Sequence, residues 1–318
     1  MNNGGLRQSI ATGSFTLPVT LLYAAAMWWA GSYTATDERT WWGGLAIVTL
    51  TAYLLMELNN RHALLRVRSR MVSSTFLVIA GTITFMHEAS LNSALPICLI
   101  LAYFALFHTY QDFRSQGYAF HAFLFLGIGA LVFPKILWLS PVFLLAMIIQ
   151  LRSISARSFF AAILGAGLPL ALREAYLLLV NGGTEILSFA TELTDFNKPR
   201  YELLSEHQLI SGAFVIFISL IATTHFFRTK FDDKIRTRMF FYIITLVEAA
   251  IVALMALQPQ GFDPLFRLLV ANSSILVAHH LAFARGVVAD IYFYVLILLT
   301  GFLAFYNFTG YTFGIWPS

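Results

Sequence analysis

Long apolar stretches separated by short polar connections set the narrowest limit on how this chain can fold. A helix needs roughly 20 apolar residues to cross a hydrocarbon core of about 30 Å. The stretches that approach or reach this length are approximately 14–33, 41–57, 71–86, 93–110, 118–133, 136–151, 157–180, 208–227, 239–257, 264–283 and 290–309. Backbone groups must be hydrogen-bonded inside lipid, and no alternating barrel pattern is visible. The predicted fold class is all-α: a polytopic transmembrane helical bundle of about eleven spans.

The scarcity of charged residues argues against a soluble fold. The chain has 318 residues, of which 58% are apolar and 11% charged, and its mean hydropathy is +0.74. Soluble domains average about 25% charged residues, and so few charges would not cover the surface of a soluble fold of this size. We therefore predict one integral membrane domain over residues 1–318. A single cysteine, Cys98, leaves no disulfide framework or thiolate metal site.

The positions of Lys and Arg predict the orientation, because cytoplasmic loops of membrane proteins carry the excess of these residues. With a cytoplasmic N-terminus, fourteen of the twenty basic residues fall on the cytoplasmic side. They are Arg7, Arg61, Arg66, Arg68, Arg70, Arg114, Arg152, Arg157, Arg228, Lys230, Lys234, Arg236, Arg238 and Arg285. Only Arg39, Lys135, Lys198 and Arg200 fall on the outer side. We predict an N-in, C-out protein of the bacterial inner membrane, with membrane lipids and not nucleic acid as the partner of its basic clusters.

The segment "ALVFPKILWLSP" (130–141) interrupts an apolar run from 118 to about 149. One long helix there would put Arg114 and Arg152 on opposite sides, whereas a hairpin turning at Pro134 and Lys135 keeps both flanks cytoplasmic. Each arm has only about 15 residues, or roughly 22 Å of helix, which is shorter than the hydrocarbon core. The arms either span a thinned region or form a re-entrant pair. The hairpin is either structural or part of a site lined by protein and water.

Residues 181–207 form the only polar stretch of any length, with five acids against two bases. Leu187, Ala190, Leu193 and Phe196 are spaced for one side of a helix. We expect a short amphipathic helix at the outer face, which either lies on the membrane surface or caps the spans.

Ionisable residues inside or beside the apolar stretches are candidate functional groups, because burying them in lipid is costly. Glu248 lies near the centre of the ninth stretch. It is neutral, paired with a buried His or Arg, hydrogen-bonded to a neighbouring helix, or part of a proton path. His121 and His225 are the other intramembrane polar candidates. Arg173 and Glu174 are neighbours in sequence, so they diverge on a helix and need not pair.

Acids and cations meet in the predicted outer connections. Asp37, Glu38 and Glu88 are the candidate catalytic acids, acting as general bases or binding a phosphate head group through a divalent cation. The candidate substrate-binding residues are Lys135, Arg173, Glu174, Arg200 and Arg267. For Asp37 and Glu38 the alternative is a solvated loop whose charge helps it to stay outside.

Several enzyme classes lack their motifs in this chain. It contains no Walker A loop, GxSxG elbow, HExxH or cysteine pair, so an ATPase, a serine hydrolase or a classical metalloprotease is unsupported. His279 and His280 are adjacent and diverge on a helix, which makes them a poor chelating pair. No protein-held metal site is predicted.

Two stretches resemble known membrane proteins. "LNNRHALLRVRSR" and "FHTYQDFRSQGYAFHAFLFLGIGALVFPKILWLSPVFLLAMIIQLRSISARSFFAAILGAGLPLAL" resemble a family of uncharacterised multipass inner-membrane proteins of Bacteroidota, over roughly residues 55–175. The topology is more distantly similar to GT-C type membrane glycosyltransferases, which use lipid-phosphate-linked sugars. That resemblance implies that Asp37 or Glu38, together with Glu88, stand where those enzymes carry outer-loop acids. It also implies that Lys135 meets a carrier phosphate.

Three functions follow as hypotheses. The first is handling of a lipid-linked glycan or lipid head group at the outer face, as a glycosyltransferase if the protein is an enzyme. The second is a transporter or flippase, which Glu248, His225, His121 and the hairpin favour. The third is a non-catalytic assembly partner of another membrane protein.

Overall fold

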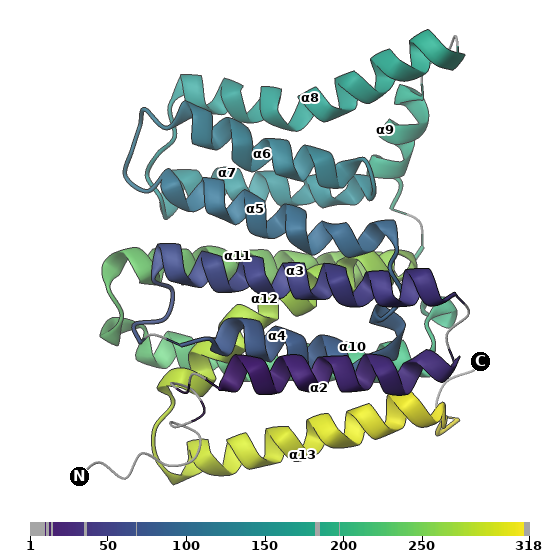
Figure 1. Ribbon diagram of the computed structural model, residues 1–318. Coiled ribbons are helices and arrows are strands. Elements are labelled where there is room, and N and C mark those ends of the chain that lie inside the picture. The colour runs from purple at the N-terminus through teal and green to yellow at the C-terminus, as the bar shows by residue number, and fades with distance from the viewer. Residues whose placement is uncertain are drawn as a thin grey trace.

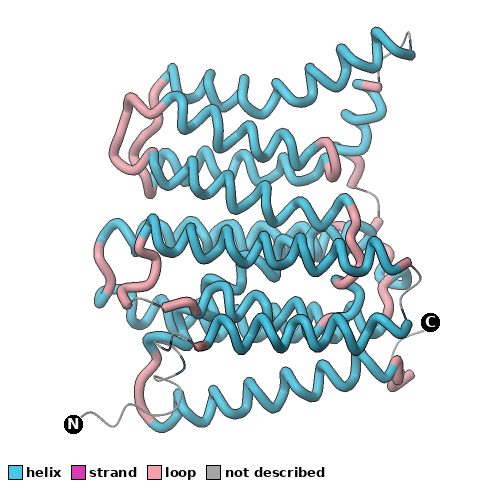
Figure 2. The backbone as a smooth tube through the Cα atoms, in the orientation of Figure 1, coloured by secondary structure: helices cyan, strands magenta, loops and turns pink. Residues whose placement is uncertain are grey.

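The computed structural model describes residues 10, 13, 15–34, 37–67, 69–181, 185–196 and 198–314. Within this part of the chain the secondary structure is helical, and no strand is present (Figure 2). The α-helices are α2 (Thr16–Gly31), α3 (Glu38–His62), α4 (Met71–Thr82), α5 (Leu95–His108), α6 (Gln116–Ala130), α7 (Leu139–Ile149), α8 (Ala156–Asn181), α9 (Ile186–Thr194), α10 (Glu206–Thr229), α11 (Ile235–Leu257), α12 (Phe262–Phe283) and α13 (Val287–Thr309).

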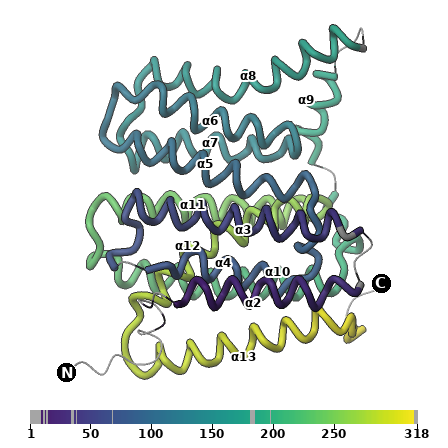
Figure 3. Tube along the Cα trace, viewed as in Figure 1, coloured from purple at the N-terminus to yellow at the C-terminus, as the bar shows by residue number. Residues whose placement is uncertain are grey.

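The long helices run side by side between two ends of the molecule (Figure 1). The chain builds α2 to α4, continues through α5 to α9, and returns with α10 to α13 beside the first helices (Figure 3). One end, here called the basic end, holds the connections 63–70, 109–115, 150–155, 230–234 and 284–286. The opposite end holds the connections 83–94, 131–138 and 258–261 together with α9.

Seven helices in the described part of the chain are long and apolar enough to cross a membrane. They are α3, α5, α8, α10, α11, α12 and α13, and α4 and the segment Pro134–Ile149 are shorter apolar helices. Every predicted stretch overlaps one helix, and the protein is a helical membrane-embedded protein. The count of eleven spans and the N-in, C-out orientation stay predictions.

Large apolar side chains are exposed along the outward face of α8, including Leu164, Leu172 and Leu179, as expected for a lipid-facing surface.

The predicted hairpin is present. Helix α6 ends at Ala130, the chain turns through 131–133, and a 3₁₀ segment from Pro134 to Trp138 leads into α7, which runs back along α6 (Figure 1). The carbonyl of Gly129 accepts hydrogen bonds from the amides of Val132 and Phe133, which closes the turn. Proline at the start of the returning segment needs no donor there, so it ends one helix and begins the next.

A short helix, α9, occupies the polar stretch at the opposite end, as predicted. The side of α9 that packs against the protein differs from the side that the sequence spacing predicted. Phe189 and Leu193 are half-buried, whereas Leu187, Ala190 and Phe196 are exposed. The indole of Trp138 donates to the carbonyl of Leu193 and holds α9 against the hairpin, with N and O 3.1 Å apart. The position of this contact selects the packed side, which helical spacing alone does not reveal.

Helices α6 and α8 cross at two glycines. A Cβ on Gly127 would lie 2.5 Å from the carbonyl oxygen of Ala166, and one on Gly165 would clash with the carbonyl oxygen of Phe120. Small residues at such crossings let backbones approach in lipid, where helix association depends on van der Waals packing.

Gly127→Ala should therefore destabilise the protein by about 1–3 kcal/mol, as overpacking usually does. Thermal unfolding in detergent measures the change. The control is Gly167→Ala in α8, where an added Cβ meets nothing within 4 Å. Equal losses of stability in the two variants would contradict the close crossing.

Candidate functional site

A polar network lies at the centre of the bundle, between α11 and α12. The Glu248 carboxylate accepts hydrogen bonds from Asn272 Nδ2 at 2.6 Å and from Ser273 Oγ at 2.5 Å. Tyr103 of α5 donates to Asn272 Oδ1 at 2.6 Å. The hydrogen bond to a neighbouring helix, one of the alternatives for Glu248, is thus present. The partners are an amide and a hydroxyl, not a histidine or an arginine.

A cavity of about 370 Å³ lies between α2, α4, α10, α12 and α13. It runs from the basic end, where α2 and α4 begin and α12 ends, toward the middle of these helices. Its lining is overwhelmingly apolar, with a few hydroxyl groups. The lining residues of α4 and α13 are Met71, Ser74, Thr75, Val78, Ile79, Phe293, Leu296, Ile297, Thr300 and Gly301. On both helices the spacing is i, i+3, i+4, i+7, i+8, so each presents one continuous face to the cavity.

Hydrogen bonds join the last turns of α13 to the bundle. At the opposite end Asn307 Nδ2 donates to the carbonyl of Thr82 at 3.4 Å, and Tyr306 Oη donates to the Glu206 carboxylate at 3.1 Å. Glu206 also accepts from the Phe313 amide at 2.7 Å. Toward the basic end α13 inclines away from α2 (Figure 1), and the cavity lies between them. The tilt of α13 therefore creates the cavity.

Two buried hydroxyls on the cavity wall have no hydrogen-bond partner. Ser74 is 2% exposed and Thr75 is 8% exposed, and the oxygen of each side chain is unbonded. Buried polar atoms in folded proteins are almost always paired. Both oxygens are themselves buried, so a side-chain rotation has to turn them toward the cavity before a polar atom of an occupant can bond to them.

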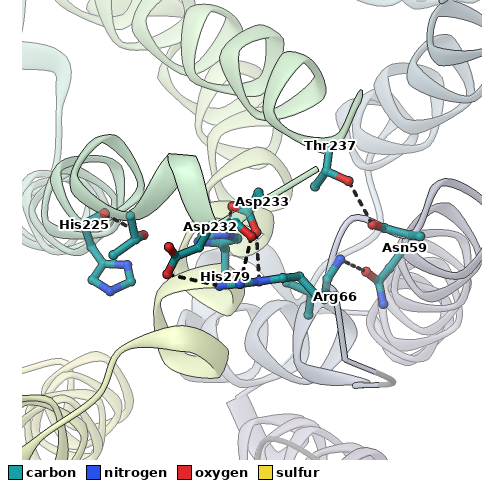
Figure 4. Close-up of polar contacts among 10 residues, drawn as sticks. Asn59, Arg66, His225, Asp232, Asp233, Thr237 and His279 are labelled. Carbon is teal, nitrogen blue, oxygen red and sulfur yellow. Dashed lines mark hydrogen bonds and ion pairs between the residues drawn. The ribbon is translucent and has the colours of Figure 1, made fainter. Parts of the chain in front are cut away.

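At the basic end a buried aspartate joins two connections (Figure 4). Asp233 has a fully buried side chain, and its carboxylate lies 3.0 Å from Arg66 Nε and 2.9 Å from His279 Nε2. Arg66 Nη1 also donates to the carbonyl of Asp232 at 3.0 Å, and the guanidinium covers the ring of Phe283 at 4.4 Å. These contacts clamp the connection 63–70 onto α10, α11 and α12.

The neighbouring histidines of α12 diverge, as predicted. His279 faces Asp233, whereas His280 stacks between His225, with ring centroids 4.5 Å apart, and Tyr292, at 4.6 Å. His225, a candidate from the sequence, therefore belongs to a ring stack at the basic end that joins α10, α12 and α13.

At the opposite end the candidate acids lie on adjoining segments. Asp37 caps α3 by accepting from the amides of Arg39 and Thr40, and these bonds lower the pKa of its carboxyl. The Ala89 amide donates to the Thr40 carbonyl at 2.8 Å, which brings the exposed Glu88 beside the start of α3. The side chain of Glu38 lies outside the described part of the structure.

The candidate cations Arg267 and Lys135 have separate partners. Arg267 is buried and binds Asp263 at 2.9 Å, the hydroxyl of Ser93 at 2.9 Å and the carbonyls of Phe85 and Met86. Lys135 donates to Gln258 Oε1 at 2.7 Å. Arg267 therefore joins α12 to the connection 83–94, and Lys135 joins the hairpin to the connection 258–261.

The remaining candidates are dispersed. Arg173 does pair with Glu174, at 3.4 Å, and also with Glu185 before α9. Arg200 is exposed near α10, and His121 is exposed on α6 with its Nδ1 2.6 Å from the Gly117 carbonyl. The structure does not bring these residues to the cavity.

His87 is a buried histidine of the opposite end that sequence reasoning did not select. Its ring stacks on Trp28, with centroids 3.8 Å apart, and Nε2 lies 3.2 Å from the Gly81 carbonyl. Burial lowers the pKa of His87 from 6.5 to about 4, and the nearby charge of Arg267 acts in the same direction. His87 is neutral at physiological pH.

Sequence reasoning missed the Asp233–His279 pair and the Ser74 hydroxyl. A signal for the first was present, since Asp232 and Asp233 are the only acids within the basic stretch from Arg228 to Arg238. Ser74 gave no comparable signal, because serines and threonines in an apolar helix usually bond to the backbone of their own helix.

In comparisons with known proteins, no family model, no curated protein and no solved structure matches the chain. Among the described residues, no group of three or more His, Cys, Asp or Glu side chains gathers as metal ligands would.

Asp233→Leu should reduce stability by on the order of 3 kcal/mol, because it leaves Arg66 and the buried His279 without their carboxylate. The matched control is Asp232→Leu, which removes a mostly exposed acid 3.9 Å from Arg66 and should cost at most about 1 kcal/mol. Chemical denaturation in detergent compares the two. Similar losses would contradict the clamp.

The lowered pKa of His87 predicts that the folded protein loses stability in acid. Because its pKa is lower in the folded state, His87 should be protonated preferentially in the unfolded state as the pH falls below 6.5. Protonation of His87 in the unfolded state should lower the free energy of unfolding by on the order of 3 kcal/mol as the pH falls from 6.5 to 4. Above pH 6.5 this loss is absent. His87→Phe keeps an aromatic ring against Trp28 but does not titrate. Melting temperatures from pH 7 to 4 should fall less in this variant than in the wild type, and parallel curves would refute the assignment.

Proposed function

We propose that this protein binds the hydrocarbon chain of a membrane lipid in the cavity between α2, α4, α10, α12 and α13, and handles that lipid as a transporter or flippase. The observation that carries the proposal is an apolar cavity of about 370 Å³ inside a membrane-embedded bundle. Its volume falls in the range of small-ligand pockets, which are typically lined by apolar residues with a few polar groups.

The tilt of α13 supports the proposal that the protein moves the lipid as well as binding it. Asn307, Tyr306 and Glu206 hold this helix at the opposite end, whereas the cavity separates it from α2 toward the basic end. Toward the basic end the Tyr292 ring stacks on His280 with centroids 4.6 Å apart, so a movement of α13 there has to separate this ring pair. We propose that this movement admits and releases the lipid chain.

The position of Glu248 also supports a transporter. Val277 lines the cavity, and Ser273, one helical turn earlier on α12, donates to the Glu248 carboxylate. The inner part of the cavity is therefore about one turn from a buried intramembrane acid. Such acids usually mark substrate or ion pathways.

A specific observation also favours the glycan-handling hypothesis at the opposite end. Asp37 and Glu88 lie on segments joined by the Ala89–Thr40 hydrogen bond, and Arg267 ties the second segment to α12. We keep transfer of a lipid-linked glycan in the bacterial inner membrane as the second candidate. Loss of activity in a cell-envelope assay on Asp37→Ala and Glu88→Ala would support it, and full activity in both variants would exclude it.

Gly301→Leu tests the main proposal. Gly301 lines the cavity, and an added Cβ there meets nothing within 4 Å, so leucine fills the space without a backbone clash. Native mass spectrometry of the purified protein titrated with phospholipid should show about tenfold weaker retention of bound lipid, equivalent to about 1.4 kcal/mol. Gly167→Leu is the matched control, because it makes the same change on the exposed face of α8. Unchanged retention in Gly301→Leu would overturn the proposal.

A further inference from the structure

We infer that the occupant of the cavity is an anionic phospholipid, with its phosphate at the basic end beside Arg70 and Arg285 and its chain linkage at Ser74 and Thr75. This inference rests on the proposed function and names the class of lipid. It is carried by the order in which chemical groups follow one another along the cavity wall.

The cavity-facing side of α4 has the polarity profile of a phospholipid. Arg70 is the exposed residue just before the helix, Ser74 lies one turn further along, and Val78 lies one turn beyond Ser74. Four residues advance about 6 Å along a helix and return to nearly the same face. A cation, a hydroxyl and an apolar side chain therefore follow one another into the bundle. A phosphate, an ester linkage and an acyl chain follow one another in the same order.

The unbonded hydroxyls of Ser74 and Thr75 point to a polar atom at the second level. Both residues are more than nine-tenths buried, both line the cavity, and neither oxygen has a partner. A purely apolar occupant would leave them unsatisfied, which is costly for a buried group. After rotation of these side chains toward the cavity, an ester carbonyl oxygen at this depth would accept a hydrogen bond from each.

A second cation lies at the same end of the cavity. Arg285 is exposed and follows Leu281, a lining residue at the end of α12, by four positions. The nearby Arg66 is already engaged with Asp233. Asp290 in the first turn of α13 is the acid on the facing helix, so the excess of positive charge comes from two arginines against one carboxylate. That balance favours a head group with one negative charge, such as phosphatidylglycerol.

Native mass spectrometry with lipids of identical chains tests the head group. The wild type should retain phosphatidylglycerol more strongly than phosphatidylcholine. Arg70→Gln and Arg285→Gln should each weaken phosphatidylglycerol retention about fivefold, with little effect on phosphatidylcholine. Arg39→Gln and Arg200→Gln, which remove exposed arginines at the opposite end, are the controls and should change the retention of neither lipid.

Ser74→Ala should weaken the retention of both lipids about threefold to tenfold, because both contain the same ester linkage.

The outcomes separate this inference from the proposed function. Equal retention of the two lipids, both lost in Gly301→Leu, would overturn the head-group inference and leave chain binding intact. Retention of both in Gly301→Leu would overturn the proposed function itself. Inorganic phosphate at millimolar concentration should not displace phosphatidylglycerol. Displacement that depends on Arg70 would show a site for free phosphate and overturn the lipid assignment.

Discussion

The polar side chains of the central helix govern how the other helices pack. Nearly every residue of α12 is buried, yet it carries Arg267, Asn272, Ser273 and His279. A buried polar group inside an apolar bundle costs several kcal/mol unless it is paired. Each of these side chains therefore requires a partner on another element: Arg267 on the connection 83–94, Asn272 on α5 and α11, Ser273 on α11, and His279 at the basic end. These bonds set the register of the bundle from one end to the other.

The same constraint explains why the cavity lies at the periphery. The helices bonded to α12 lie together along their length. Helix α13 is joined to the bundle by the hydrogen bonds of Asn307, Tyr306 and Glu206 at its last turns and by the stacking of Tyr292 on His280 near its start. Toward the basic end α13 faces the cavity with apolar side chains, and in lipid these gain little by leaving acyl chains for a protein neighbour. An acyl chain therefore suits the chemistry of this space, and the polar bonding of α12 accounts for both the close packing at the centre and the apolar cavity at the edge.

Helix positions were predictable because lipid enforces backbone hydrogen bonding, so each apolar stretch overlaps one helix. Charge placement predicted a hairpin with its turn at Pro134 and Lys135, and the chain turns just before them, through 131–133. The contacts between helices were less accessible. From the sequence alone we expect Asp37 to be an acid of a loop, but it lies directly before α3 and caps the start of that helix. The Asn307–Thr82 hydrogen bond joins residues 225 positions apart in the sequence, and the Asp233–His279 pair joins residues 46 positions apart. Local sequence patterns do not predict contacts between residues so far apart. The lining of the cavity comes from five helices that lie far apart in the sequence, so hydropathy along the chain does not reveal it.

A cryo-electron microscopy structure of the protein in lipid nanodiscs would test the central claim most directly. We expect one elongated density between α4 and α13, passing Ser74 and Val78 on one side and Thr300 on the other, with its wider end among the arginines of the basic end. An α13 packed against α2 and α4 along its whole length, with lipid density only around the outside of the bundle, would contradict it.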